Sequence, residues 1–210
     1  MIRVVVADDH EIVRAGVRRI LGDHPDLRVV AEATSGDEVL TTLATVPADV
    51  IVLDISMPGP GIFDLLQLIG ERHPAVRTVV LTMYPEDQYA VRVLRAGAAA
   101  YLSKARSADF LVEAIRTAFR GGVFVSPSVG DTLAAHVVGR AERPLHQQLS
   151  DRELDVLVRI ARGESVKAIA LDLGLSRKTV STYHARIRQK LHLRSDADLI
   201  RYALAQHLVE

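Results

Sequence analysis

Short apolar runs and longer amphipathic segments alternate along the first 120 positions of the chain. The runs are rich in Val and Ile and are apolar at nearly every position, which is typical of parallel strands covered on both faces of a sheet. The predicted strands are Ile2–Ala7, Arg28–Ala33, Asp49–Leu53, Arg77–Thr82 and Ala99–Leu102.

The segments between these runs place apolar residues three and four positions apart, as amphipathic helices do. The helices are indicated by Ile12, Val13, Val17, Ile20 and Leu21, by Val39, Leu40, Leu43 and Val46, and by the ranges Leu65–Arg72, Gln88–Ala96 and Ala108–Phe119. Strands that alternate with helices predict an α/β fold, a doubly wound five-stranded parallel sheet with right-handed crossovers. A ligand site is expected beyond the carboxyl ends of its strands.

From Leu149 onward the pattern is helical throughout. Ser150 and Glu153 form a capping box before the first of four predicted helices. The second contains Val166, Ile169, Ala170 and Leu173, the third follows Ser176, and the fourth spans Asp196–Gln206. The tight Gly174-Leu175-Ser176 turn predicts a helix-turn-helix in a small all-α domain, residues 149–210, with the third helix as the recognition element.

The stretch between these parts, residues 121–148, is interpreted as a linker, which leaves residues 1–120 as the first domain. Ser126-Pro127 is a typical helix start, and a short helix would follow with Leu133, Ala134, Val137 and Val138 on its apolar face. Residues 139–148 lack periodicity and are expected to form a flexible tether.

The composition indicates the cellular compartment and shows that charge is unevenly distributed along the chain. The chain has no cysteine, so disulfides and thiolate metal sites are excluded, and no signal peptide or membrane span is apparent, which favours a cytoplasmic protein away from membranes. Basic and acidic residues number 26 each, but residues 176–194 hold six basic side chains and no acidic one. Such a concentration of one sign suggests an anionic partner.

Polar side chains follow the predicted strands where a ligand is expected. Asp8-Asp9 follow the first strand, Asp54 the third, Thr82 ends the fourth and Lys104 follows the fifth. Each alone is an ordinary turn, cap or solvated residue. Together, carboxylates suit Mg²⁺, and an ammonium with a hydroxyl suits a phosphoryl group.

One side of the predicted recognition helix could read DNA. Lys178, Ser181, Thr182, Ala185 and Arg188 share that side, and Arg177, Arg186 and Lys190 flank it. Small polar residues let a helix approach base edges, while cations meet phosphates. A solvated amphipathic helix is the alternative, and the helix-turn-helix context favours DNA.

The first domain resembles the flavodoxin-like receiver domain of bacterial two-component response regulators. The resemblance rests on Asp8-Asp9, the run from Asp54 to Gly59, Thr82, the Ala-Gly-Ala turn at 96–98, Tyr101 and Lys104. It implies that Asp54 accepts a phosphoryl group from a sensor histidine kinase. It also implies Mg²⁺ held by Asp9, Asp54 and the Ser56 main-chain carbonyl, with Asp8 acting mostly through water.

The same resemblance assigns roles beyond the metal. Thr82 and Lys104 would contact phosphoryl oxygens, and Tyr101 would be an aromatic switch that turns inward when Thr82 moves. The family usually has a proline after its lysine, joined by a cis peptide bond, whereas Ala105 stands here. A cis bond before a non-proline residue costs about 2.5–4 kcal/mol, so this loop either retains a strained bond or is trans.

The segment from Leu149 to Leu157, with Ile169-Ala170 and the run from Leu175 to Tyr183, resembles the LuxR-type DNA-binding domain. Together the two parts resemble a NarL/FixJ-family response regulator. The resemblance implies double-stranded DNA with an inverted repeat as target and a homodimer that forms upon phosphorylation through Leu199, Ile200 and Ala203. The expected DNA-binding residues are Arg177, Lys178, Thr179, Ser181, Thr182, His184, Ala185, Arg186 and Arg188.

Two other functions remain open. The chain could be a phosphatase with Asp54 as nucleophile, although such enzymes commonly carry a second acid two residues on, where this chain has Ser56. It could also be a regulator that binds DNA without phosphorylation. The full acidic set disfavours that interpretation, and Ala105 slightly favours it.

Overall fold

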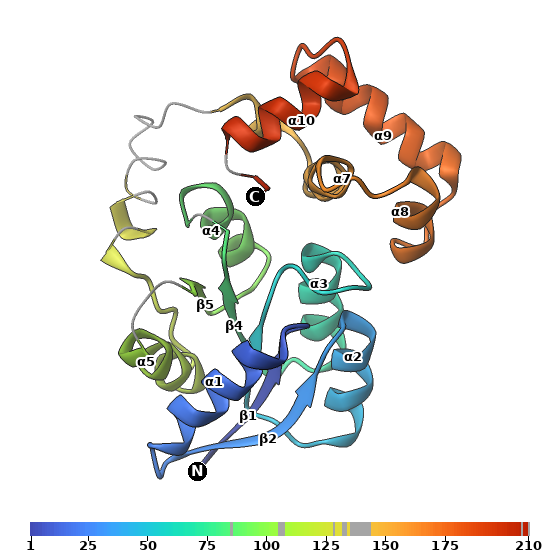
Figure 1. The fold of residues 1–210 in the computed structure, drawn as a ribbon. Helices are drawn as coiled ribbons and strands as arrows, with labels where there is room; N and C mark the ends of the chain where they lie inside the picture. The colour runs from blue at the N-terminus through green and yellow to red at the C-terminus, as the bar shows by residue number, and fades with distance from the viewer. Residues whose placement is uncertain are drawn as a thin grey trace. The chain divides into compact units, whose positions relative to one another are not determined.

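The computed structural model describes residues 1–84, 86–104, 108–127, 129–131, 134, 144–206 and 208–209, except for the side chains of residues 86–88 and 147. The chain divides into two compact units, Met1–Asp131 and Thr132–Glu210 (Figure 1). Among the described residues, no helix combines the length and the apolar character that crossing a bilayer requires.

The first unit is built on a five-stranded parallel sheet with strand order β2-β1-β3-β4-β5. Its strands are β1 Ile2–Ala7, β2 Leu27–Ala33, β3 Val50–Leu53, β4 Arg77–Thr82 and β5 Ala100–Ser103. Each boundary agrees with the predicted strand to within one residue. Because β3 lies beside β1 and β4 lies beside β3, the polar residues that follow β1, β3 and β4 meet at one edge.

Helices cover both faces of this sheet (Figure 1). They are α1 Glu11–Gly22, α2 Gly36–Thr45, α3 Ile62–Arg72, α4 Glu86–Arg95 and α5 Ala108–Phe119. Valines of β1, β3 and β4 form a core with Val17 and Leu21 of α1 and Ile115 of α5. The sequence pattern starts α3 at Leu65, but the helix starts at Ile62 because the Leu65 amide already donates to the carbonyl of Gly61.

Ile12 differs from its prediction. The sequence pattern assigns it to the apolar stripe of α1, yet it is 82% exposed. Ile12 lies in the first turn of the helix, whereas the buried positions Val17 and Leu21 lie farther along it.

The first unit extends beyond residue 120 into the stretch interpreted as linker. The Phe124 amide donates to the Ala99 carbonyl at 2.8 Å, and the Phe124 ring packs edge-on against Phe110. These contacts place Phe124 in the core beside β5. Ser126 caps the next turn through its hydroxyl, which accepts from the Val129 amide at 3.3 Å. Leu133, Val137 and Val138 of the expected linker helix lie outside the described residues.

The second unit contains η1 Leu145–Gln148, α7 Asp151–Ala161, α8 Val166–Asp172, α9 Arg177–Lys190 and α10 Asp196–Ala205. The capping box of Ser150 and Glu153 forms as predicted. Residues 145–148 are expected in a flexible tether, but they form a 3-10 helix. This helix is held because the amide of the buried His146 donates to the Tyr202 hydroxyl at 3.0 Å and the His146 ring packs edge-on against the Tyr202 ring.

A buried arginine connects the first two helices of this unit. Arg159 of α7 is 8% exposed, and its guanidinium lies 3.2 Å from Asp155, 3.4 Å from Glu164 and 3.2 Å from Asp172 of α8. A buried charge is tolerated when opposite charges and hydrogen bonds satisfy it. Asp155 on α7 and Glu164 before α8 satisfy the guanidinium, and its pair with Asp172 holds α8 against α7.

We predict that Arg159→Ala destabilises the second unit by about 3–5 kcal/mol, because three acidic groups lose a buried counter-charge. Denaturant unfolding of this variant measures the loss. Arg152→Ala, which removes a longer and more exposed pair with Asp155 on the same helix, is the matched control and should have a much smaller effect. If both variants lost the same free energy of unfolding, the burial of the Arg159 ion pairs would not account for their contribution to stability.

Candidate metal centre and nucleic-acid interface

Sheet hydrogen bonds carry the backbone one residue past the ends of β1 and β3. The Asp8 amide donates to the Ala33 carbonyl at 3.1 Å, and the Asp54 amide donates to the Ala7 carbonyl at 2.9 Å. Both aspartates are 3% exposed. The sheet thus fixes two buried carboxylates side by side.

Lys104 provides their counter-charge from the far side of β4. Its amide donates to the Thr82 carbonyl at 2.8 Å, which directs the residue across the sheet edge. The ammonium Nζ lies 2.6 Å from Asp8 Oδ2 and 3.0 Å from Asp54 Oδ2. The sequence prediction that these residues converge is therefore correct in geometry.

Burial and neighbouring charges shift the pKa values of Asp54 and Lys104. At Asp54, burial raises the pKa above its usual value, the charge of Lys104 opposes this rise, and the charge of Asp8 adds to it. Burial alone would lower the pKa of Lys104, but its hydrogen bond to Asp8 and the charge of Asp54 outweigh burial and raise it. Lys104 therefore stays an ammonium ion that stabilises two carboxylates.

The same edge has the ligand atoms that Mg²⁺ prefers. Asp8, Asp9 and Asp54 each offer a carboxylate oxygen and His10 offers a ring nitrogen, and these atoms all lie within 4.8 Å of one another; the oxygens are the atoms that suit Mg²⁺. Carboxylate oxygens around an open, partly exposed Asp9 suit a hard cation that keeps several waters. The acidic cluster fits the ion that the resemblance implies.

His10 was missed by the sequence analysis. Its Nδ1 lies 2.8 Å from Asp9 Oδ1, and its amide donates to Asp8 Oδ1 at 2.9 Å. Its position directly after the two aspartates was the available sign.

Thr82 and Tyr101 lie behind the cluster. Thr82 is fully buried, and its hydroxyl accepts from the Tyr84 amide at 3.4 Å. The Tyr101 hydroxyl donates to the Tyr84 carbonyl at 3.1 Å, and the Tyr101 ring is buried. Tyr101 thus occupies the inward position that was expected only after Thr82 moves.

Two expectations at this edge stay predictions. One is the contact between the Ser56 main-chain carbonyl and the metal ion. The other is the peptide bond between Lys104 and Ala105, which involves a residue outside the described ones, so the choice between cis and trans stays open.

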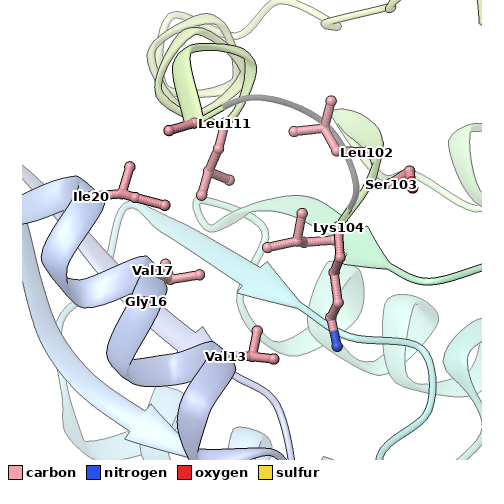
Figure 2. A pocket seen from close by; sticks show the side chains of 10 residues that line it. Val13, Gly16, Val17, Ile20, Leu102, Ser103, Lys104 and Leu111 are labelled. Atoms are coloured by element: carbon pink, nitrogen blue, oxygen red, sulfur yellow. The ribbon is translucent and has the colours of Figure 1, made fainter.

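An apolar hollow of about 220 Å³ lies next to the cluster, between α1 and α5. Figure 2 shows Val13, Val17 and Ile20 of α1 on one side, Leu102 and Leu111 on the other, and Lys104 at its margin. The aliphatic stem of Lys104 contributes to this lining while its ammonium group binds the carboxylates.

The recognition helix α9 follows the turn at Gly174, whose φ of +63° is a backbone conformation that favours glycine. The Ser176 hydroxyl caps α9 by accepting from the Thr179 amide at 3.1 Å. Most of the predicted DNA-facing set is exposed, namely Arg177, Lys178, Ser181, Thr182, Ala185 and Arg186, and Thr179 is partly exposed.

Other predicted DNA-binding residues of α9 are engaged elsewhere. His184 is turned toward α10, with its Nε2 2.8 Å from Asp196 Oδ1, so it does not belong to the exposed face. Arg188 lies 3.7 Å from the same carboxylate. Lys190, expected to flank the DNA, lies 2.6 Å from the buried Glu153 and holds α9 against α7. Helical spacing could not reveal these partners because they come from other helices.

The predicted dimer contacts on α10 also need correction. Leu199 and Ala203 are fully buried, so neither is accessible to a second chain. Ile200 is exposed, and Leu204, one turn further on, is exposed too. The accessible apolar strip of α10 is therefore Ile200 with Leu204.

Comparison with known families matches both units. The response regulator receiver domain matches residues 4–116, and the luxR family of bacterial regulatory proteins matches residues 147–203. The chain belongs to the NarL/FixJ family of two-component response regulators, DNA-binding proteins in which a receiver domain is joined to a LuxR-type helix-turn-helix.

Individual relatives match the chain over its whole length. Response regulator GacA of Pseudomonas viridiflava is 36% identical over 211 residues, covering 100% of this chain and 99% of that protein. Response regulator UvrY of Escherichia coli K12 is 36% identical over 210 residues, covering 99% and 96%. RcsB of Salmonella enterica serovar Typhimurium, solved on the rprA promoter with a phosphomimetic, is similar with a TM-score of 0.76 at 28% identity, covering 96% and 97%.

We predict that Lys104→Ala destabilises the first unit by about 3 kcal/mol near neutral pH. Without the ammonium group, the pKa of Asp54 rises further above its unfolded value. The stability contribution of such a group is present below the unfolded pKa and is lost as pH rises through the folded pKa. The loss should therefore be larger near about pH 8 than near about pH 5.

Urea unfolding at the two pH values measures this difference. Arg116→Ala, which breaks an exposed pair with Asp26, is the control and should show little pH dependence over this range. If Lys104→Ala lost the same free energy of unfolding at both pH values, the charge of Lys104 would not control the pKa of Asp54 as predicted.

Proposed function

We propose that Asp54 is the phosphoacceptor of this response regulator and that a sensor histidine kinase is its donor. The observation that supports this most is the buried carboxylate of Asp54, 3.0 Å from Lys104 and beside Asp8 at the edge of the sheet. Asp54 is the acid that directly follows β3, the central strand of the sheet. Mg²⁺ would be the cofactor, and Asp8, Asp9, Asp54 and the Ser56 main-chain carbonyl would hold it.

Phosphoryl transfer to Asp54 needs a nucleophile that attacks the phosphorus and positive charge near the phosphoryl oxygens. An Asp54 carboxylate oxygen attacks the phosphorus of the phosphohistidine, the P–N bond breaks with its electron pair going to the imidazole, and an acyl phosphate forms on Asp54. A cation held by the acidic cluster would supply positive charge that stabilises the transferred phosphoryl group. Lys104 leaves Asp54 Oδ2 for a phosphoryl oxygen, and the Thr82 hydroxyl donates to another.

We propose that phosphorylation is read through Thr82 and Tyr101. When the Thr82 hydroxyl follows the phosphoryl group, its hydrogen bond from the Tyr84 amide breaks, and the Tyr101 hydrogen bond to Tyr84 holds the rearranged loop. Coupling to dimerisation requires such a two-state element. The dimer would form through Ile200 and Leu204 of α10.

The output is binding of an inverted-repeat promoter site in double-stranded DNA, which in a bacterium means that the protein acts in the cytoplasm. The exposed face of α9 enters the major groove, where Ser181, Thr182 and Ala185 lie next to base edges. Arg177, Lys178 and Arg186 contact phosphates, and Arg188 joins them by exchanging Asp196 for a phosphate. RcsB, whose structure on a promoter is similar to this chain, supports this role.

We predict that Asp54→Asn abolishes phosphorylation. The wild-type protein, incubated with Mg²⁺ and acetyl phosphate and weighed intact, should gain one phosphoryl group, and Asp54→Asn should gain none. Asp23→Asn, an exposed substitution after the far end of α1, is the control and should label as the wild type does. Labelling of Asp54→Asn at the wild-type level would refute the assignment.

The labelled protein also separates the alternatives. A regulator that depends on phosphorylation should sediment with a larger dimer fraction and bind its operator more tightly once labelled. Unchanged sedimentation and binding would favour regulation without phosphorylation. Rapid turnover of added phosphate esters, with no labelled protein accumulating, would favour the phosphatase.

We predict distinct effects for two positions of α9. Lys178→Ala should weaken binding to operator and random DNA alike, and it should reduce the salt slope by roughly 0.9 for each phosphate that is no longer neutralised. Thr182→Leu should change the preferred bases, by about 1–3 kcal/mol for a mismatched pair.

Salt titrations with both DNAs measure these effects, with Arg201→Ala on α10 as a control that should leave them unchanged. An unaltered slope for Lys178→Ala, or equal weakening on both DNAs for Thr182→Leu, would show that this orientation of the helix is wrong.

A further inference from the structure

Arg14, on the second turn of α1, is nearly buried beside the acidic cluster. Its side chain is 13% exposed, and its guanidinium makes two directed contacts. Nη1 donates to the main-chain carbonyl of Asp8 at 2.8 Å, and Nε donates to the Glu32 carboxylate at 3.0 Å. Glu32 lies at the end of β2, opposite Val6 of β1. Arg14 therefore bridges the end of β2 and the turn that follows β1.

This bridge acts on the peptide between the two aspartates. The amide of Asp8 is held by Ala33, and its carboxylate is held by Lys104 and by the His10 amide. The carbonyl of Asp8 belongs to the peptide unit that leads to Asp9. A rotation of that peptide plane would redirect the Asp9 carboxylate, and the Arg14 hydrogen bond opposes the rotation.

Glu32 makes such a bridge compatible with cation binding. A guanidinium near a metal site repels the metal, but the Glu32 carboxylate offsets part of the charge of Arg14. Arg18, one turn further along α1, pairs with the same carboxylate. Within the described part of the chain, Arg18 makes no hydrogen bond to Asp8, so it shares the charge environment of Arg14 without the bridge.

We propose that Arg14 is a positioning residue for the metal centre, which orients the Asp8–Asp9 turn so that both carboxylates face the cation. The proposal rests on the metal site described under the proposed function. Mutation of such a residue, which contacts the metal ligands and not the metal, typically lowers metal affinity by about 10–100-fold.

The sign of the effect separates positioning from simple electrostatics. Removing a positive charge near a cation site strengthens cation binding by Coulomb's law. Loss of the hydrogen bond from Arg14 to the Asp8 carbonyl weakens cation binding. Arg14→Ala is therefore expected to lower metal affinity by about 10-fold or more, whereas Arg18→Ala should leave it unchanged or slightly raised.

Mn²⁺ prefers the same oxygen ligands as Mg²⁺ and can be counted in its free form by electron paramagnetic resonance. Full-length protein is titrated with Mn²⁺, and the Asp9→Asn variant provides the background of other sites. Arg14→Lys keeps the charge beside Glu32 but lacks the planar fork that reaches both partners. It should lose affinity as Arg14→Ala does, and it serves as the second variant if the alanine variant unfolds.

Labelling by acetyl phosphate gives an independent readout. Both Arg14 variants should need about 10-fold more Mg²⁺ for half-maximal labelling yet reach the wild-type rate at saturating Mg²⁺, because Asp54 and Lys104 are unchanged. Wild-type Mn²⁺ affinity in a folded Arg14→Lys variant, or an equal loss in Arg18→Ala, would overturn the role of Arg14 and leave the metal site standing. A wild-type protein that binds no more Mn²⁺ than Asp9→Asn would overturn the metal site and this inference with it.

Discussion

Two carboxylates end neighbouring strands almost out of contact with water, and the ammonium group of Lys104 lies within 3.0 Å of both. Taking like charges out of water is costly, and a nearby cation offsets part of that cost. In this structure Lys104 does so from the end of β5. Amide hydrogen bonds to Ala33 and Ala7 fix Asp8 and Asp54 at the sheet edge, where Lys104 can reach both.

The excess negative charge of the two carboxylates also determines which ligands the cluster suits. A site that holds excess negative charge against one lysine is suited to a divalent cation and then to a phosphoryl group, each of which alters the charge balance. The Lys104 amide is hydrogen-bonded to the main-chain carbonyl of Thr82, so the backbones of Lys104 and Thr82 are held side by side at this edge.

In the second unit, ion pairs hold helices against one another. Glu153 caps α7 and binds Lys190 of α9, while Arg159 joins α7 to α8 through Asp172. These contacts hold the C-terminal ends of α8 and α9 against α7. The cations that remain exposed on α9, Arg177, Lys178 and Arg186, are then presented together on a rigid support, which favours contact with a regularly spaced phosphate backbone.

Apolar runs determined the strands because both faces of a parallel sheet are covered, and parallel topology alone brought Asp8, Asp54, Thr82 and Lys104 to one edge. Local hydrogen bonding determined the capping box at Ser150, since its partners are three residues apart. Tertiary structure decided what long side chains meet: Lys190 binds Glu153, His184 faces Asp196, and Arg14 reaches Asp8 and Glu32. It also decided that Leu199 and Ala203 of α10 are core while Ile200 is surface. Helical spacing states which residues share a face, but the neighbours of that face come from distant parts of the chain, and only the folded arrangement brings them into contact.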